Sequence, residues 1–126
     1  MKILIVEDED ALARVLREKL EKEDYEVEVV DNGADAFSVA EKTRPDIVIL
    51  DLILPKKDGF EVLAELKADA ELKTVPVVVL SNLGEDEHIK RAFSLGASDY
   101  FVKTQHPLLE IVEKVKAQLT RGGAIV

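Results

Sequence analysis

Short apolar runs alternate with stretches of helical period along the chain. The continuous runs are Ile3–Val6, Ile47–Leu50 and Val75–Leu80, and each has the length of a buried strand. The clearest helical stripe, with apolar residues three or four positions apart, contains Leu108, Ile111, Val112, Val115 and Leu119. Alternation of strands with helices is typical of βα units that build a parallel sheet.

The composition of each strand also predicts its place in the sheet. Strands covered on both faces read as continuous apolar sequence, whereas half-exposed strands alternate apolar with polar residues. The segment Tyr25–Val30 alternates acids with valines, and Asp99–Val102 is short and mixed. An order of 2-1-3-4-5 places both of these weaker strands at edges. We therefore expect an α/β fold of the flavodoxin-like, doubly wound (βα)5 type, with helices on both faces of five parallel strands.

Four further stripes predict the remaining helices. The first of them is expected to face the core and contains Leu12, Val15, Leu16 and Leu20. The other three are weaker and consist of Phe37 with Ala40, Phe60 with Leu63 and Leu66, and Ile89 with Ala92 and Phe93. Gly96 follows the last stripe and predicts the C-terminal stop of that helix.

The length of 126 residues predicts one domain. Periodicity ends after Leu119, and two glycines follow in the last seven residues. We therefore expect a folded domain over residues 1–120, with a flexible tail or the start of a linker over residues 121–126.

The charge of the chain argues against several classes of partner. The net charge is −9, which repels phosphate backbones and anionic lipid headgroups. We therefore expect neither nucleic-acid nor membrane binding. The absence of cysteine excludes disulfides and thiolate metal sites, and no apolar segment approaches membrane-spanning length. Both observations favour a cytoplasmic protein.

Polar residues follow the predicted strands at the edge where ligands of such sheets bind. Glu7–Asp10 follows the first strand, Asp51 the third, Ser81 the fourth and Lys103 the fifth. The predicted order makes the acids after the first and third strands neighbours, and such carboxylates stay ionised together when they share a cation. Oxygen ligands point to Mg²⁺, Mn²⁺ or Ca²⁺, and a site with few carboxylates, which leaves places for water and a phosphoryl oxygen, favours Mg²⁺.

Nucleotide cradles are missing from these loops. The first loop is not a GxGxxG turn, and the chain has no GxxxxGK[ST] segment. Asp51, in contrast, meets the requirements of a phosphoryl acceptor, because it is a carboxylate nucleophile with a cation, a lysine and a hydroxyl nearby. Mg²⁺ and Lys103 would neutralise the added charge, and Ser81 would donate a hydrogen bond to a phosphoryl oxygen.

Together, five segments resemble the receiver domains of two-component response regulators, and the resemblance covers about the whole chain. They are Ile3–Glu9, Ile47–Leu52, Leu54–Gly59, Val79–Ser81 and Gly96–Lys103. The resemblance implies a stand-alone receiver whose Asp51 accepts a phosphoryl group from a phosphohistidine. The donor would be a sensor histidine kinase or a histidine phosphotransfer protein, and the chain would be a signalling protein, not a turnover enzyme.

The resemblance also implies a metal site for Mg²⁺, with Mn²⁺ as the second choice. Asp8 and Asp51 would be ligands together with the backbone carbonyl of Ile53, and Glu7 would act directly or through water.

The switch implied by the resemblance consists of three side chains. Lys103 would pair with the phosphate, Ser81 would move toward it, and Tyr100 would rotate inward behind Ser81. The signal would then reach a downstream protein through the face formed by the fourth helix, the fifth strand and the fifth helix, in a monomer or weak dimer.

Several positions depart from the family pattern. Asn82 stands where most members have a small residue, and Thr104 stands where most have proline. Access to Asp51 is therefore expected to be narrower, and a cis peptide after Lys103 is not expected. Ile53 and Leu83 are apolar where polar side chains could orient a hydrolytic water, which predicts a long-lived phosphoryl group.

Other interpretations remain open at this point. The acids could serve only to begin a helix, Ser81 to cap one, and both histidines and Lys103 to lie at the surface. The chain could be a degenerate receiver that binds partners without phosphorylation. It could also be an aspartyl-phosphate Mg²⁺ phosphatase of the haloacid-dehalogenase type, although such enzymes have a second aspartate where this chain has Ile53.

Overall fold

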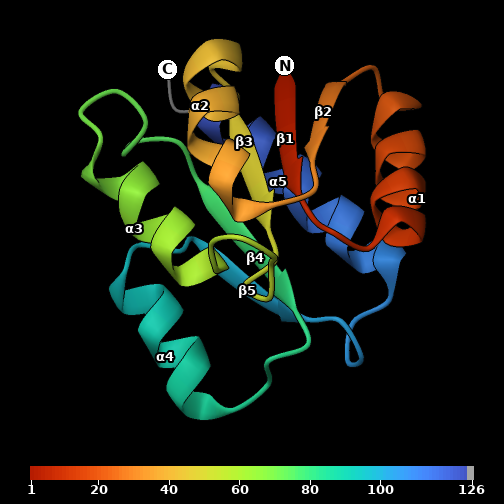
Figure 1. Cartoon of the computed structure of the whole chain (residues 1–126). Helices are drawn as coiled ribbons and strands as arrows, with labels where there is room; N and C mark the ends of the chain where they lie inside the picture. The colour runs from red at the N-terminus through yellow and green to blue at the C-terminus, as the bar shows by residue number, and fades with distance from the viewer. Residues whose placement is uncertain (125–126) are drawn as a thin grey trace.

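The computed structural model describes the backbone of residues 1–124 and the side chains of residues 1–120 (Figure 1). Its five strands are β1 (Lys2–Val6), β2 (Glu26–Val30), β3 (Ile47–Leu50), β4 (Val77–Ser81) and β5 (Asp99–Val102). Its five helices are α1 (Asp10–Glu21), α2 (Gly33–Thr43), α3 (Gly59–Ala68), α4 (Asp86–Ser94) and α5 (Leu108–Ala124). No helix within these residues is both long and apolar enough to span a membrane.

The strands form one parallel sheet of order β2-β1-β3-β4-β5, which confirms the predicted flavodoxin-like, doubly wound fold. The weak strands β2 and β5 lie at the edges, as their mixed composition predicts. Val6 is in register with Leu50, so β1 and β3 end at the same level. The next residues, Glu7 and Asp51, therefore leave the sheet side by side.

Two apolar layers hold the helices on the sheet. Alternate strand residues point to opposite faces, so Leu4 packs with α2, α3 and α4 while Ile3 packs with α1 and α5. Figure 1 shows α1 and α5 on one side of the strands and α3 and α4 on the other. Every residue of β3 is buried, which explains its uninterrupted apolar sequence.

The prediction for the first helix was partly wrong. Helix α1 buries Ala13, Leu16 and Leu20, whereas Val15 is 39% exposed and Leu12 is half-buried. Ala13 is small enough to approach the sheet, so α1 turns the face with Ala13, Leu16 and Leu20 toward the core and leaves Val15 outside it. An exposed valine on an outer helix is common, because the surface of a folded protein is more than half apolar.

The end of α4 agrees with the prediction from the sequence, whereas α5 extends further than predicted. Gly96 follows α4 with φ at +109°, the left-handed conformation that suits a glycine stop. Helix α5 ends at Ala124, beyond the expected domain limit at residue 120. Residues 125–126 lie outside the described part of the chain, and a tail over residues 121–126 stays a prediction.

Helix α3 begins directly against the backbone that carries Asp51. Asp58 caps this helix by accepting a hydrogen bond from the Glu61 amide at 3.1 Å. The amide of Gly59 donates to the Leu52 carbonyl at 2.9 Å, and a Cβ on Gly59 would lie 2.3 Å from the Asp51 carbonyl oxygen. Only glycine allows α3 to pack this closely on the loop that follows β3.

Candidate functional site

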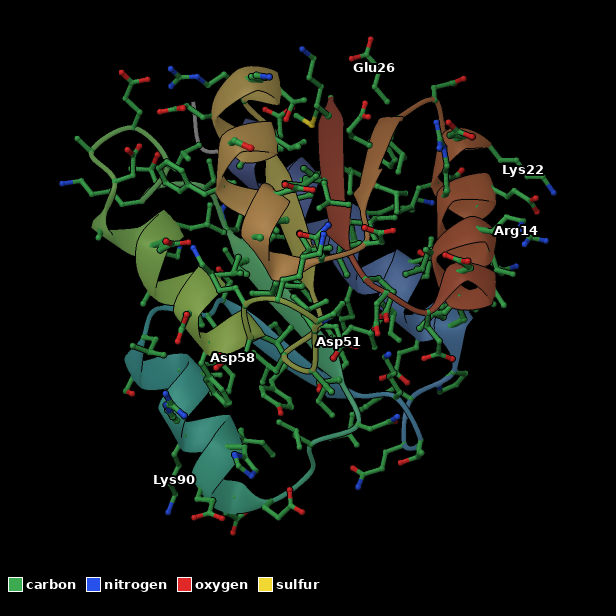
Figure 2. All side chains as sticks on the ribbon, in the orientation of Figure 1. Arg14, Lys22, Glu26, Asp51, Asp58 and Lys90 are labelled. Carbon is green, nitrogen blue, oxygen red and sulfur yellow. The ribbon has the colours of Figure 1, made fainter. Side chains whose placement is uncertain are left out.

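Three carboxylates meet at the carboxyl ends of β1 and β3. One oxygen from each of Glu7, Asp8 and Asp51 lies within 4.8 Å of the other two. Glu7 and Asp51 are 3% and 4% exposed, while Asp8 is exposed to solvent. The amide of Asp51 donates to the Val6 carbonyl at 3.0 Å, which fixes these residues side by side. Figure 2 shows Asp51 at the end of its strand.

Lys103 reaches this cluster from the far side of β4. Its amide donates to the Ser81 carbonyl at 2.9 Å, so it continues the pairing of β5 with β4 by one residue. Its Nζ lies 3.0 Å from Asp51 Oδ2 and 3.0 Å from Glu7 Oε1. The side chain is only 12% exposed, which excludes the interpretation of Lys103 as a surface lysine.

Glu9 is a member of the site to which the sequence assigned no role. Its Oε1 accepts a hydrogen bond from Lys103 Nζ at 3.0 Å, and its side chain is 59% exposed. The signal in the sequence was its place in the acidic run after β1. Three carboxylates therefore surround one ammonium group, two of them buried and one at the surface.

This arrangement shifts the pKa of both partners. The pKa of Glu7 is raised to about 7, mainly by burial and also by the charge of Asp51, while Lys103 offsets part of the effect. Burial opposes the charge on Lys103, but the hydrogen bonds that it donates to Glu7, Asp51 and Glu9 outweigh burial and raise the pKa of Lys103 above its ordinary value. A single lysine does not neutralise the cluster, so its oxygen donors fit a hard divalent cation.

We expect Mg²⁺ binding to weaken as the pH falls through about 7, the pKa of Glu7. A raised pKa means that the folded, metal-free protein keeps the Glu7 proton below that pH, and a cation must displace it. From this pKa, Mg²⁺ affinity should be roughly tenfold lower at pH 6 than at pH 8. Calorimetric titration measures the change, and Glu7→Gln should remove most of it. Equal affinity of the wild type at both pH values would contradict the prediction.

Ser81 and Tyr100 meet at the backbone of Leu83. Ser81, the last residue of β4, is fully buried, and its Oγ accepts a hydrogen bond from the Leu83 amide at 3.4 Å. The Tyr100 hydroxyl donates to the Leu83 carbonyl, and this side chain is 8% exposed. Burial and the charges of Asp51 and Glu85 raise the pKa of Tyr100. Tyr100 is thus buried in this structure, and its role as a switch residue that rotates stays a prediction.

The loop after β3 wraps around Asp51. The Ile53 amide donates to Asp51 Oδ1 at 3.1 Å, and the Ile53 side chain is 52% exposed beside it. Asn82, after β4, is also exposed. Metal ligation by the Ile53 carbonyl and narrowing of access by Asn82 stay predictions.

The two histidines are more involved in packing than expected for surface residues. His88 and His106 have side chains 32% and 30% exposed. The His88 ring lies 6.0 Å from the Phe60 ring, and the His106 ring lies edge-on to Phe101 at 5.2 Å. Their apolar surfaces therefore cover aromatic residues.

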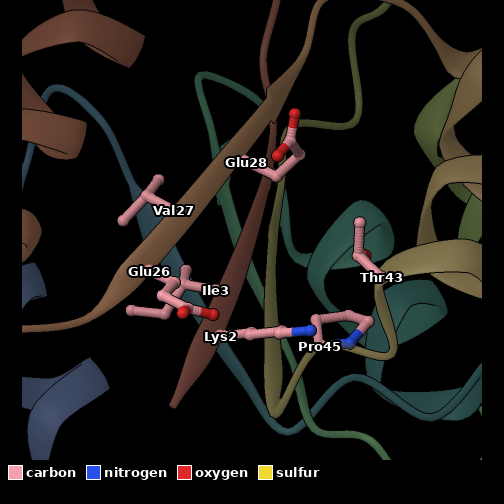
Figure 3. A pocket seen from close by; sticks show the side chains of 7 residues that line it. All are labelled: Lys2, Ile3, Glu26, Val27, Glu28, Thr43 and Pro45. Carbon is pink, nitrogen blue, oxygen red and sulfur yellow. The ribbon is translucent and has the colours of Figure 1, made fainter.

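A pocket of about 280 Å³ lies at the opposite edge of the sheet from Asp51 (Figure 3). Lys2 and Glu26, at the amino-terminal ends of β1 and β2, line it together with Pro45 and with Glu28 from the middle of β2. Its position separates it from the carboxylate cluster, so it takes no part in the candidate site.

Comparison with known proteins finds a match over almost the whole chain. The family model of the response regulator receiver domain matches residues 3–116. The transcriptional regulatory protein SrrA of Staphylococcus aureus is 40% identical over 119 residues. This alignment covers 94% of the chain and 48% of SrrA, so the chain spans about half the length of this relative.

Solved structures agree with that match. The Mn(2+)-bound form of response regulator Rcp1 has a TM-score of 0.84 and 33% identity, with 92% of this chain and 91% of that chain covered. The BeF3-activated N-terminal receiver domain of Klebsiella pneumoniae RstA has a TM-score of 0.86 and 31% identity, with 94% and 98% covered.

Proposed function

Because this chain belongs to the response regulator receiver domain family, we propose that Asp51 accepts a phosphoryl group from a phosphohistidine. The donor would be a sensor histidine kinase or a histidine phosphotransfer protein. The observation that carries the proposal is the contact of Asp51 with Lys103 Nζ at 3.0 Å, within a cluster of three carboxylates. A nucleophile, a fixed cation and a set of metal ligands are thereby brought together.

The transfer forms one bond and breaks one. A carboxylate oxygen of Asp51 attacks the phosphorus atom, and the bond from phosphorus to the imidazole nitrogen breaks. The imidazole leaves with the electron pair and takes up a proton, while Asp51 becomes an acyl phosphate. Lys103 is already placed beside Asp51, so it can pair with the oxygens of the new group without a large rearrangement.

The donor set fits Mg²⁺, with Mn²⁺ as the second choice. Asp8 and Asp51 would hold the ion, with the carbonyl of Ile53 as a third protein ligand and Glu7 acting directly or through water. Bound there, the ion would neutralise charge that develops on the phosphoryl oxygens. The Mn(2+) of the related Rcp1 structure supports this choice of metal.

Phosphorylation would act on the switch residues and through them on a partner. Ser81 would move toward the phosphoryl group and donate its hydroxyl to a phosphoryl oxygen, and this movement would break the hydrogen bond that Ser81 Oγ accepts from the Leu83 amide. Because Tyr100 binds the carbonyl of the same residue, the two side chains respond together. The outer face of α4, β5 and α5 would carry the signal to a downstream protein in the cytoplasm.

Intact mass after incubation with acetyl phosphate tests this function directly. With Mg²⁺ we expect a single phosphoryl adduct, and with a chelator we expect none. Borohydride reduction of the adduct should convert Asp51, and no other residue, to homoserine. Absence of an adduct while a known receiver is labelled in parallel would favour a degenerate receiver. Continuous release of phosphate from many esters would favour a phosphatase.

The phosphoryl group should be long-lived, because apolar side chains stand at two positions near Asp51. Ile53 and Leu83 offer no group that could orient a hydrolytic water. We expect Ile53→Asn combined with Leu83→Glu to speed dephosphorylation roughly 100-fold, the lower end of what a positioned acid–base group contributes. Decay of the adduct, followed by mass, measures this rate, with Ile53→Leu as the apolar control. A wild-type rate equal to that of the double variant would contradict the prediction.

A further inference from the structure

Helix α4 has few buried side chains, and two of its residues lie on one aromatic ring of α3. Ala92 is the one buried residue of this helix. Phe60 of α3 is 6% exposed, and the guanidinium carbon of Arg91 lies 4.1 Å from the centroid of its ring. The His88 ring covers the same side chain, with its centroid 6.0 Å away. Phe60, His88 and Arg91 are called the α3–α4 clamp below.

The α3 side of the clamp is fixed to the phosphoacceptor loop. Phe60 directly follows Gly59, whose amide is bonded to the Leu52 carbonyl and whose Cα packs on the Asp51 backbone. The first turn of α3 is further held by the Asp58 cap. The ring therefore has little freedom to move relative to Asp51.

The α4 side of the clamp leads to the switch. The chain runs from Leu83 through Gly84 and Glu85 into the first turn of α4, where the amides of His88 and Ile89 donate to the Glu85 carbonyl. Leu83 is thus three residues before the helix. Its amide bonds Ser81 and its carbonyl bonds Tyr100, so its position affects both switch residues.

We propose that the α3–α4 clamp positions the switch, because by fixing α4 on α3 it holds the Leu83 backbone where Ser81 and Tyr100 bond to it. Loss of the Arg91 contact, which lies in the last turn of α4, loosens the whole helix on α3. This shifts the population toward conformations in which Tyr100 loses its acceptor and turns outward. Arg91 and Phe60 are positioning residues and do not touch the reacting atoms. The consequence for signalling rests on the proposed function, whereas the mechanical coupling does not.

The chain contains two tyrosines, Tyr25 and Tyr100, and no tryptophan, so Tyr25→Phe leaves Tyr100 as the single fluorescent reporter. In that background, acrylamide quenching at neutral pH measures the exposure of Tyr100. We expect Arg91→Met and Phe60→Leu each to raise the quenching constant roughly two- to fivefold, the population change that an exposed cation–π contact can supply. Lys90→Met is the matched control, because Lys90 is an exposed cation on the same helix (Figure 2).

Unchanged quenching in Arg91→Met would overturn the proposal, as would an equal rise in Lys90→Met. Urea unfolding tests whether each variant is folded. If Phe60→Leu does not fold, the quenching of Arg91→Met alone decides whether the proposal holds. Quenching needs no phosphoryl group, so this result is independent of whether Asp51 is phosphorylated. Where acetyl phosphate labels the parent protein, the labelling rate of Arg91→Met should fall by a similar factor.

Discussion

Asp51→Asn is expected to take up no phosphoryl group at any concentration of acetyl phosphate or Mg²⁺. The amide oxygen carries no full charge and is a poor nucleophile, and no neighbouring carboxylate has the same contacts with Lys103 and the Ile53 amide. The loss should therefore be complete, as measured by intact mass. Asp58→Asn is the matched control, since it makes the same change in the same loop and asparagine is also a good cap for α3 (Figure 2).

Asp51→Asn should leave the metal-free protein as stable as the wild type at pH 8 or make it more stable. Asp51 and Glu7 repel each other inside the fold, and the charge of Asp51 is one cause of the raised pKa of Glu7. Removing that charge lowers the pKa of Glu7 toward its ordinary value. Urea unfolding measures the stability. An adduct on Asp51→Asn would show that another residue is the acceptor, and a large loss of stability would show that the structural role of Asp51 had been underestimated.

Lys103→Met is expected to lower the free energy of unfolding of the metal-free protein by about 3 kcal/mol at pH 8, the lower range for removing one partner of a buried ion pair. Glu7 and Asp51 would remain in the interior without their cation. The loss should be smaller at pH 5, because Glu7 then carries a proton and needs no partner. Added Mg²⁺ should restore much of the stability by taking the place of the ammonium group.

Urea unfolding at both pH values, with and without Mg²⁺, measures these effects. Lys57→Met is the control, because the ion pair of Lys57 with Glu65 is more exposed and such pairs contribute at most about 1 kcal/mol. Equal losses for the two lysines would refute the buried role of Lys103. The same Lys103 variant should also fail to stabilise the inward Tyr100 after labelling, since it lacks the group that pairs with phosphate.

Several features of this fold could be predicted because they depend on local sequence. A buried parallel strand must be apolar on both faces, and this revealed β1, β3 and β4 as well as the edge position of β2. The end of each strand follows from the end of its apolar run, within about two residues. Asp51, Ser81 and Lys103 can therefore be assigned to one edge of the sheet from the sequence.

Other features were missed because they depend on how helices are rotated and which rotamers meet. The stripe on α1 placed Val15 in the core, whereas Ala13 took that place. In the sequence Glu9 is one more acid at the start of a helix. In the structure its carboxylate accepts a hydrogen bond from Lys103, which lies 94 positions further along the chain. No pattern in the sequence indicated what the two histidines contact. In the structure His88 of α4 lies on the ring of Phe60 of α3.

Local sequence predicts the fold class and the acids, hydroxyl and lysine available at the ligand-binding edge, and it is compatible with the strand order that the structure establishes. These depend on the period of apolar residues and on strand ends, which are properties of neighbours in the chain. Three contacts follow only from the folded structure: Lys103 bonds three carboxylates, the Leu83 backbone bonds both Ser81 and Tyr100, and Arg91 covers Phe60. Such contacts join segments far apart in sequence, and packing of the whole core sets their geometry.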